Sequence, residues 1–369
     1  ERFKAGRLLA EFVLHFSSFQ PNFVLSPRIG VFQIKDPSLE ISRMCDRALM
    51  ALRSIKSGSA QRVAYYDDSM RKRILEEQAL IGDMEEALRL EQYEVYLQPQ
   101  YNHRTRKIVG AEALVRWNHP QRGMIPPNTF IPILEKNGFI SRLDYFVWER
   151  VCNLLVRWRE QGLPSVSISV NVSGADIHMP NLSGTLLDLT QKYGVEPHEL
   201  RLEITETAYM ENAERFVTVI GALRSNGFLV EMDDFGKGYS SLNTLKNVPV
   251  DVLKLDMGFL HETESSGGRS GVILNSILHM AHWLNLPVIA EGVETLRQAD
   301  YLASIGCDIV QGYLYARPLP IPEFEALLAR GEAGDFIGDY ALLSQIDVEE
   351  LWNPDSEATA IFRSFVGPA

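Results

Sequence analysis

The chain has 369 residues, of which 46% are hydrophobic, and its formal net charge is −12 at pH 7. This length suffices for two domains, or for one barrel with an appendage. The acidic balance argues against a surface for long nucleic acid or for an anionic membrane, but it is compatible with a small phosphate-bearing substrate whose charge is neutralised by metal ions.

The cysteines and the apolar segments indicate where the chain resides. The three cysteines are scattered and show no CxxC spacing, so we expect neither a disulfide framework nor a zinc site. We expect the chain to reside in a reducing compartment. No apolar run approaches the ~18 residues of a membrane span, and no signal peptide is visible. We expect a cytoplasmic piece of a longer protein without direct membrane contact of its own, although an upstream region could carry an anchor.

Residues 1–66 predict an incomplete α/β unit. A helix over residues 3–19 precedes a strand at Arg28–Ile34, a helix from Ser38 to about Lys56, and a strand at Arg62–Tyr66. Asp67 and Asp68 are candidate N-caps of a linker helix over residues 67–90. We expect this helix to connect or to pack, and not to catalyse.

Residues 91–330 alternate short strands with helices. Tyr93–Gln98 and Ile108–Trp117 flank a polar turn and predict a hairpin, and a helical region follows from Asn128 to about Gln161. The later strands are Ser165–Val172, Leu200–Thr205, Phe228–Asp233, Val250–Asp256, Pro287–Glu291 and Ile309–Tyr313. The helices between them are Leu182–Tyr193, Ala213–Asn226, Ser240–Lys246, Arg269–Leu284 and Thr295–Ile305.

Eight strands with outer helices predict an α/β fold, a closed (β/α)8 TIM-like barrel whose opening hairpin makes the first strand antiparallel. A doubly wound open sheet is the alternative, but no glycine-rich phosphate turn follows the first strand. Residues 331–369 form a C-terminal extension to which the sequence gives no chemical role.

Oxygen-bearing side chains stand at the ends of most of these strands. Asp233 and Asp234 are adjacent carboxylates that repel each other, and a hard divalent cation relieves such repulsion. A solvated acidic loop explains one such pair equally well, but the pattern recurs along the chain. The strand ends carry Glu112, Asn171, Glu203 with Glu206, Asp233 with Asp234, Lys254 with Asp256, Glu291 with Glu294, and Gln311.

This recurrence predicts a metal site, because the carboxyl ends of barrel strands meet at one mouth. Repulsion among so many carboxylates is costly without cations. An all-oxygen set without histidine or cysteine favours Mg²⁺ or Mn²⁺. The carboxylates suffice for two ions, and a paired site suits in-line displacement at phosphorus.

Two cationic side chains accompany these carboxylates. Lys254 precedes Asp256 by two residues and shares its face of the strand, where it could orient an attacking water or form a plain salt bridge at the rim. Arg116 follows Glu112 by four residues on the same face and is a candidate phosphate contact, with an ion pair as the alternative. The histidines show no ligand constellation.

Seven motifs now follow one another along the chain. They read EALVRW from Glu112, VNVSG around Asn171, LEITET from Leu202, DDFGKGYSSL from Asp233, LKLD from Leu253, AEGVET from Ala290 and QGYLYARP from Gln311. Together they resemble the signature of the EAL-domain cyclic di-GMP phosphodiesterases over roughly residues 80–330. That family's fold is a barrel with an antiparallel first strand. Residues 1–66 resemble the C-terminal part of a GGDEF, diguanylate-cyclase-type domain, without its signature.

The resemblance implies hydrolysis of one phosphodiester bond of cyclic di-GMP to linear 5′-pGpG with two Mg²⁺ or Mn²⁺ ions. Lys254 would orient the attacking water or take its proton, Glu206 would brace the loop after Asp234, and Gln311 would support water at the metal site. The implied metal ligands are Glu112, Asn171, Glu203, Asp233, Asp234 and Glu291. The implied substrate-binding set is Gln98, Leu114 and Arg116, with Asp256 and Glu294 behind them.

One position departs from the family pattern, since Lys237 stands where threonine is more common, which concerns the loop and not the ligands. The resemblance also implies a homodimer. Two other functions stay open. One is a receptor that binds cyclic di-GMP without cleaving it, although such members lack several ligands and this chain lacks none. The other is a metal-dependent barrel of another reaction class, such as a lyase acting on a carboxylic acid, which would leave the cyclic dinucleotide untouched.

Overall fold

The structure is a computed structural model that describes residues 27–55, 61–235, 248–256 and 269–330, together with Arg7 and Glu11. The chain divides into two compact units, residues 1–86 and 87–369. Among the described residues, none of the helices combines the length and the apolar character needed to cross a bilayer.

The first unit is a small parallel sheet with a helix packed on it. Strands β1 (Ile29–Val31) and β2 (Val63–Tyr65) pair in parallel, and α2 (Ile41–Arg53) lies close above them. Gly30 permits this close approach, because a Cβ there would lie 1.9 Å from the carbonyl oxygen of Ala48. Helix α3 (Asp68–Arg89) follows β2 and has nearly the bounds of the helix predicted over residues 67–90. The helix expected over residues 3–19 falls almost wholly outside the described residues.

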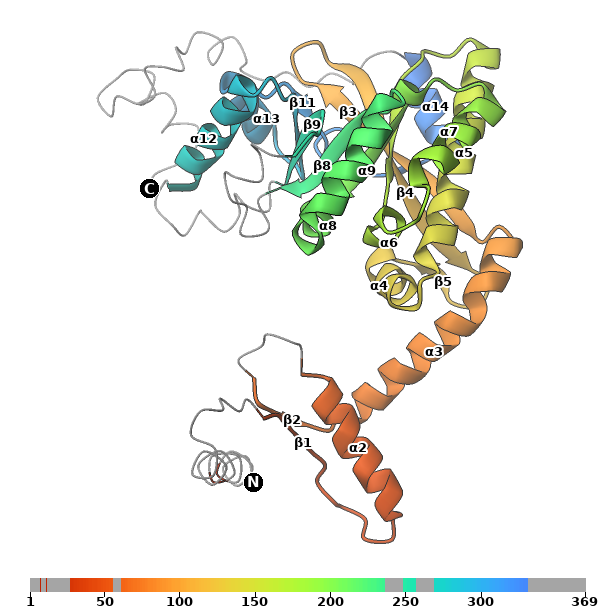
Figure 1. Cartoon of the computed structure of the whole chain (residues 1–369), viewed down its shortest axis with the longest axis vertical. Coiled ribbons are helices and arrows are strands. Elements are labelled where there is room, and N and C mark those ends of the chain that lie inside the picture. The colour runs from red at the N-terminus through yellow and green to blue at the C-terminus, as the bar shows by residue number, and fades with distance from the viewer. Residues whose placement is uncertain are drawn as a thin grey trace. The chain divides into compact units, whose positions relative to one another are not determined.

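The second unit is a closed eight-stranded barrel, as the sequence predicts (Figure 1). The strands β4, β6, β7, β8, β9, β10 and β11 run parallel, and β3 is antiparallel to both of its neighbours, β4 and β11. In chain order the barrel strands are β3 (Tyr93–Asn102), β4 (Lys107–His119), β6 (Ser167–Asn171), β7 (Leu200–Thr205), β8 (Val230–Phe235), β9 (Val252–Asp256), β10 (Val288–Glu291) and β11 (Ile309–Val310).

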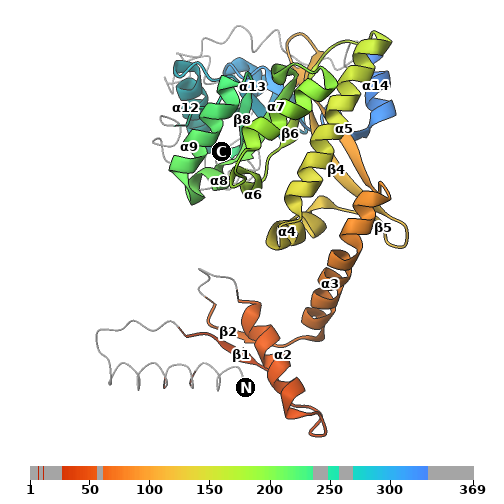
Figure 2. The same cartoon turned by 45° about the vertical axis from the view of Figure 1, so that its right-hand side comes forward.

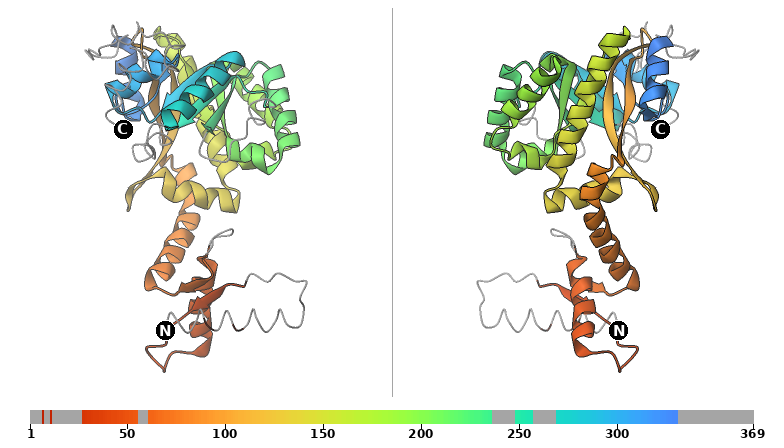
Figure 3. Two further views of the ribbon diagram at one scale, coloured as in Figure 1. Left: turned by 90° about the vertical axis from the view of Figure 1, so that its left-hand side faces the viewer. Right: turned by 90° about the vertical axis from the view of Figure 1, so that its right-hand side faces the viewer.

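Pairing of the first barrel strand with the last closes the barrel. Tyr101 of β3 lies opposite Val310 of β11, and Leu97 lies opposite Leu319 of the short β12 (Leu319–Pro320). Figure 3 shows this closure as orange strands lying beside the blue C-terminal elements. A further short strand, β5 (Gly123–Ile125), forms a hairpin with the end of β4.

Helices cover the outside of the barrel. Figures 1 and 2 show α5 beside α7, and α9 along β8. Left-handed glycines end three of them, namely Gly138, Gly162 and Gly194, since glycine adopts a positive φ without strain. The covering helices are α4 (Pro127–Asn137), α5 (Ile140–Gln161), α7 (Leu182–Tyr193), α9 (Ala213–Ser225), α12 (Arg269–Trp283), α13 (Leu296–Ser304) and α14 (Ile321–Arg330), with the shorter α6 (Gly174–Ile177) and α8 (Glu206–Glu211) between them.

Two predicted strand boundaries are wrong for identifiable reasons. Strand β3 continues past Pro99 to Asn102, because the pairing with β4 resumes after a register shift at Gln100 and Tyr101. Strand β11 ends at Val310 and not at Tyr313, because the following backbone bonds to Val293 instead. The short helices α6, α8 and α14 were not predicted. The expected helix Ser240–Lys246 lies outside the described residues.

Alternation along the strands separates an apolar outer face from a polar inner face. In β7, Leu200, Leu202 and Ile204 are fully buried in the hydrophobic core, whereas Arg201 and Glu203 lie on the opposite face. The inside of such a barrel is usually filled with branched apolar side chains. In this barrel it holds charged groups, which have to be explained.

Candidate active site

The sheet register gathers the predicted acidic residues at one end of the barrel. Asn171 lies opposite Glu203, Thr205 opposite Asp233, and Asp256 opposite Glu291. Because parallel strands place their carboxyl ends together, these side chains share one mouth. The register therefore brings together in space what the sequence offers only as separate motifs.

Lys254 lies at the centre of this mouth. Its side chain is fully buried, and Nζ lies 2.7 Å from Glu203 Oε1 and 2.7 Å from Glu291 Oε1. The same ammonium lies 3.2 Å from Glu112 Oε2 and 3.8 Å from Asp233 Oδ1. We call these five residues the Lys254 cluster. Four carboxylates against one ammonium leave a formal charge of −3 in the interior of the barrel.

The ionisation of the cluster reflects this imbalance. Burial by itself would lower the pKa of Lys254, but Glu112, Glu203, Glu291 and Asp233 together raise that pKa well above the ordinary value. Burial, and then the charge of Glu112, raise the pKa of Glu203. Burial also raises the pKa of Glu291, to about 8. Without further cations, the cluster would therefore take up protons near neutral pH.

A bulge in β8 carries the adjacent aspartates. The register between β8 and β9 shifts between Met232 and Phe235, and Asp234 has a positive φ of 57°. Its backbone N–H donates to Asp233 Oδ1 at 2.8 Å. A left-handed non-glycine residue costs of order 1–3 kcal/mol, and such strain concentrates at functional sites. Bulges beside active sites re-aim side chains, which agrees with a role for this pair.

Two buried glutamines complete the inner part of the site. Gln311 donates a short hydrogen bond from Nε2 to Glu112 Oε2, and the same nitrogen lies 3.3 Å from Gln98 Oε1. Gln98 donates in turn to the carbonyl oxygen of Ala316 at 3.2 Å. The predictions for Gln98, Gln311, Glu112, Glu203, Asp233, Lys254 and Glu291 thus fall on one connected group.

The other predicted residues lie around this group. Arg116 is half-buried above the ring of Tyr96, 5.6 Å from its centroid, and Glu206 is buried at the first position of α8. Asn171 and Glu294 are exposed, and Leu114, Asp234 and Asp256 are half-buried. Their predicted roles stay predictions. Lys237 and most of the loop that Glu206 would brace lie outside the described residues.

The cluster suits divalent cations chemically, although it is not arranged as a finished metal site. Among the described residues, no group of three or more histidine, cysteine or acidic side chains is placed to hold one ion together. The carboxylates converge on Lys254 instead. Both carboxylate oxygens of Glu203 are buried without a hydrogen-bond partner, since the 2.7 Å approach to Lys254 is an ion pair without hydrogen-bonding geometry. Such oxygen donors and the surplus negative charge fit Mg²⁺ or Mn²⁺.

A second charged group inside the barrel, which we call the Arg201 pair, was not predicted from the sequence. Glu231 is fully buried, accepts a hydrogen bond from Ser169 Oγ at 2.9 Å, and lies 3.2 Å from an Arg201 guanidinium nitrogen. Arg201, Ser169 and Glu231 each precede a predicted site residue by two positions. The period-two alternation of the strands was the signal that could have identified them.

A third buried polar arrangement lies beside the Asn171 loop. Asp144 of α5 and Asp176 of α6 are both buried, and Asp144 Oδ2 and Asp176 Oδ1 have no hydrogen-bond partner. Burial, and then the neighbouring Asp176, raise the pKa of Asp144 well above its ordinary value. If one of the two residues is a carboxylic acid, its proton can form a hydrogen bond between the two unpartnered oxygens. We therefore interpret Asp144 and Asp176 as a proton-sharing pair.

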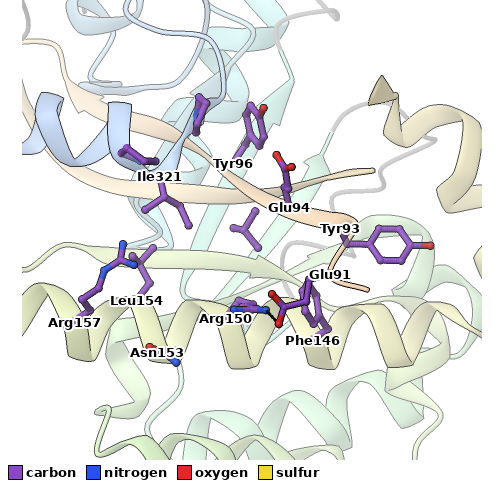
Figure 4. A pocket seen from close by; sticks show the side chains of 13 residues that line it. Glu91, Tyr93, Glu94, Tyr96, Phe146, Arg150, Asn153, Leu154, Arg157 and Ile321 are labelled. Carbon is purple, nitrogen blue, oxygen red and sulfur yellow. Dashed lines mark ion pairs between the residues drawn. The ribbon is translucent and has the colours of Figure 1, made fainter. Parts of the chain in front are cut away.

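A hollow of about 350 Å³ lies on the outer surface of the barrel, away from these residues (Figure 4). It is lined by the start of β3, by α5 and by the start of α14, and Arg150 forms an ion pair with Glu91 across one end. The lining includes none of the predicted site residues. Its arginines pair with carboxylates and its Glu94 accepts a hydrogen bond from Asn118, so the candidate for chemistry is the barrel mouth.

Known proteins resemble the chain over this same region. A family model described as the EAL domain matches residues 81–318. A bifunctional diguanylate cyclase/cyclic di-GMP phosphodiesterase of Pseudomonas aeruginosa, MucR, is 33% identical over 265 residues, which are 72% of this chain and 38% of that protein. The cyclic di-GMP phosphodiesterase NbdA of the same organism is 32% identical over 305 residues, 83% of this chain and 39% of that protein.

A solved structure has the same fold. The structure named as the MucR phosphodiesterase in complex with c-di-GMP matches with a TM-score of 0.63 and 34% identity, covering 67% of this chain and 99% of that one. The chain spans about 40% of the length of the curated relatives described here.

Proposed function

The chain belongs to the EAL domain family, and from this premise we propose that it hydrolyses one phosphodiester bond of cyclic di-GMP to linear 5′-pGpG. The observation that carries the proposal is the Lys254 cluster, in which four carboxylates and a single ammonium meet inside the barrel. Each buried ion costs roughly several kcal/mol in desolvation. A receptor that only binds its ligand does not need to bury so much uncompensated charge.

We propose that two Mg²⁺ or Mn²⁺ ions are held by Glu112, Asn171, Glu203, Asp233, Asp234 and Glu291. Bound ions of this kind supply Lewis acidity and charge neutralisation for attack of water at phosphorus. The surplus negative charge of the cluster and the buried Glu203 Oε2, which has no hydrogen-bond partner, support this assignment.

The chain's own residues would position the reacting groups. Lys254 lies within 4 Å of four carboxylates, so as an ammonium it can hold them in a fixed arrangement and orient the attacking water. To take the proton of that water, Lys254 would first have to lose its own, against its raised pKa. Gln311 donates to Glu112 and fixes the direction of that carboxylate. Glu206 would brace the loop after Asp234.

Substrate binding is proposed for the wall of the mouth formed by β3 and β4. Gln98 and Glu112 lie opposite each other in the register, as do Tyr96 and Leu114. Arg116 is a planar cation near this wall and can pair with a phosphate in a bidentate manner. Asp256 and Glu294 would lie behind these contacts. The name of the matched MucR structure, a c-di-GMP complex, supports this choice of ligand.

The test is chromatography of cyclic di-GMP incubated with the purified chain and Mg²⁺ or Mn²⁺, with and without a chelator. We expect linear 5′-pGpG, its loss on chelation, and its loss in Glu112→Ala. The matched control is Glu149→Ala, which removes a carboxylate of the outer surface that pairs with Lys192. Tight binding without product would replace the proposal by a receptor function, and an untouched, unbound dinucleotide would leave a barrel of another reaction class.

Three further assignments are proposals of the same kind. Residues 1–66 would derive from the C-terminal part of a GGDEF-type domain, the chain would be cytoplasmic, and it would form a homodimer. The parallel β1–β2 pair with α2 is compatible with the first of these. Sedimentation of the purified chain tests the homodimer.

A further inference from the structure

A third glutamine lies behind the two already described in the site. Gln100 follows Gln98 by two residues on β3 and is fully buried, and Gln98 and Gln311 are also buried. Gln100 Nε2 donates to Gln311 Oε1 at 3.1 Å. A buried amide that leaves its donors or acceptors unpaired loses stability. The three side chains therefore constrain one another's orientation.

The chemistry of Glu112 sets the direction of this chain of amides. An ionised carboxylate only accepts hydrogen bonds, so Gln311 has to present its NH2 group to Glu112. The carbonyl oxygen of Gln311 then points the other way, towards Gln100, and needs a donor there. The NH2 group of Gln100 supplies it.

Donation from Gln100 to Gln311 leaves the other end of the Gln100 amide, its oxygen, without a hydrogen bond. Gln100 Oε1 is buried and has no hydrogen-bond partner. It lies against Gly110, which is directly opposite Gln100 in the β3–β4 register, and a Cβ on Gly110 would lie 2.7 Å from that oxygen. The neighbouring strand thus leaves room for the amide but provides no hydrogen-bond donor to its oxygen. A buried unsatisfied acceptor in a native fold calls for an explanation.

We propose that Gln100 is a positioning residue that fixes the amide of Gln311 so that its NH2 group faces Glu112. Without a donor at position 100, the carbonyl oxygen of Gln311 loses its partner, and only the acceptors Glu112 Oε2 and Gln98 Oε1 still hold the NH2 group. The Gln311 amide then turns more easily, and an orientation with its carbonyl oxygen against the Glu112 carboxylate is repulsive and misdirects Glu112. The proposal rests on the proposed function, in which Glu112 and Gln311 belong to the catalytic site.

The first test is a double-mutant cycle on cyclic di-GMP hydrolysis. We expect Gln100→Met to lower kcat by about tenfold, the effect of roughly one hydrogen bond, with KM nearly unchanged. In a Gln311→Met background, the same substitution should have no further effect, because Gln100 acts only through Gln311. The matched control is Gln191→Met, an exposed glutamine of α7, which should leave kcat unchanged.

A second variant gives a readout that simple packing would not move. In Gln100→Glu the protonated acid can donate to Gln311, whereas the carboxylate only accepts. We therefore expect kcat of this variant to fall with rising pH along a limb that the wild type lacks. The side-chain ¹⁵N amide resonance of Gln311, assigned by its loss in Gln311→Met, should shift in Gln100→Met even in the metal-free protein.

The outcomes separate this proposal from the proposed function. Absence of turnover by the wild type would contradict the proposed function, and the amide resonance would then still report on Gln100. Wild-type turnover with full activity in Gln100→Met, or additive losses in the cycle, would overturn the positioning role. If Gln100→Met fails to fold, a Gln100→Glu variant with the wild-type pH profile would overturn it instead.

Discussion

Two buried charged groups lie in the same barrel, and they differ in balance. The Arg201 pair sets one guanidinium against one carboxylate, with Ser169 donating to the second carboxylate oxygen. The Lys254 cluster, two residues further along the strands, sets one ammonium against four carboxylates. A balanced group needs no further partner, whereas the surplus of negative charge is the observation on which the proposed cations rest. The comparison separates a charge-balanced layer of the barrel interior from the layer for which we propose catalysis.

The largest expected effect is that of Lys254→Met, which keeps the length of the side chain and removes its charge. We expect turnover of cyclic di-GMP to fall at least about a hundredfold, the usual effect of losing a positioned proton-transfer or orienting group. Lys192→Met is the matched control, since it removes a lysine that pairs with a carboxylate on the outer surface. Turnover within tenfold of the wild type, measured by chromatography, would reduce Lys254 to a structural ion pair.

The Arg201 pair should respond in the opposite way. Glu231→Leu leaves Arg201 without its partner, and we expect the barrel to lose about 2–4 kcal/mol of stability, less than for a fully buried charge because the Arg201 side chain is 21% exposed. The double variant Arg201→Met/Glu231→Leu should recover most of this loss, because no unpaired charge then remains.

Urea denaturation measures both variants, and turnover per folded molecule should stay within about threefold of the wild type, since the expected effect is on stability and not on transition-state binding. A large loss of kcat in the double variant, with stability retained, would show that the two groups act as one and that the comparison is wrong.

The smallest expected effect concerns Asp144 and Asp176, the buried pair of aspartates that we interpret as sharing one proton. Because the folded state raises the pKa of Asp144, the stabilisation is complete below the ordinary aspartate pKa and is lost as pH rises through the folded value. Asp144→Asn donates without titrating. We expect its advantage over the wild type to grow with pH to about 1 kcal/mol, the worth of roughly one buried hydrogen bond.

Thermal denaturation from pH 4 to pH 9 measures this difference. Asp188→Asn, on the outer helix α7, is the control. Parallel curves for Asp144→Asn and the wild type would contradict a shared proton.

Much of this architecture could be predicted from sequence, because it depends on local signals. The strands at Leu200–Thr205 and the helix at Leu182–Tyr193 have the predicted bounds, since alternation and a C-terminal glycine mark them. The acidic strand ends could be assigned to one mouth by barrel geometry alone. Glu231 and Gln100 were missed because a polar residue inside a strand acquires meaning only from its partner across the barrel, and those partners are distant in sequence.

The antiparallel strand has a consequence for how the domain is joined to other segments. Leu97 and Tyr96, near the start of the domain, pair with Leu319 and Pro320 near its end. The polypeptide thus enters and leaves the barrel at adjacent points. A domain whose entry and exit points are neighbours can be inserted between two other domains without forcing those domains far apart.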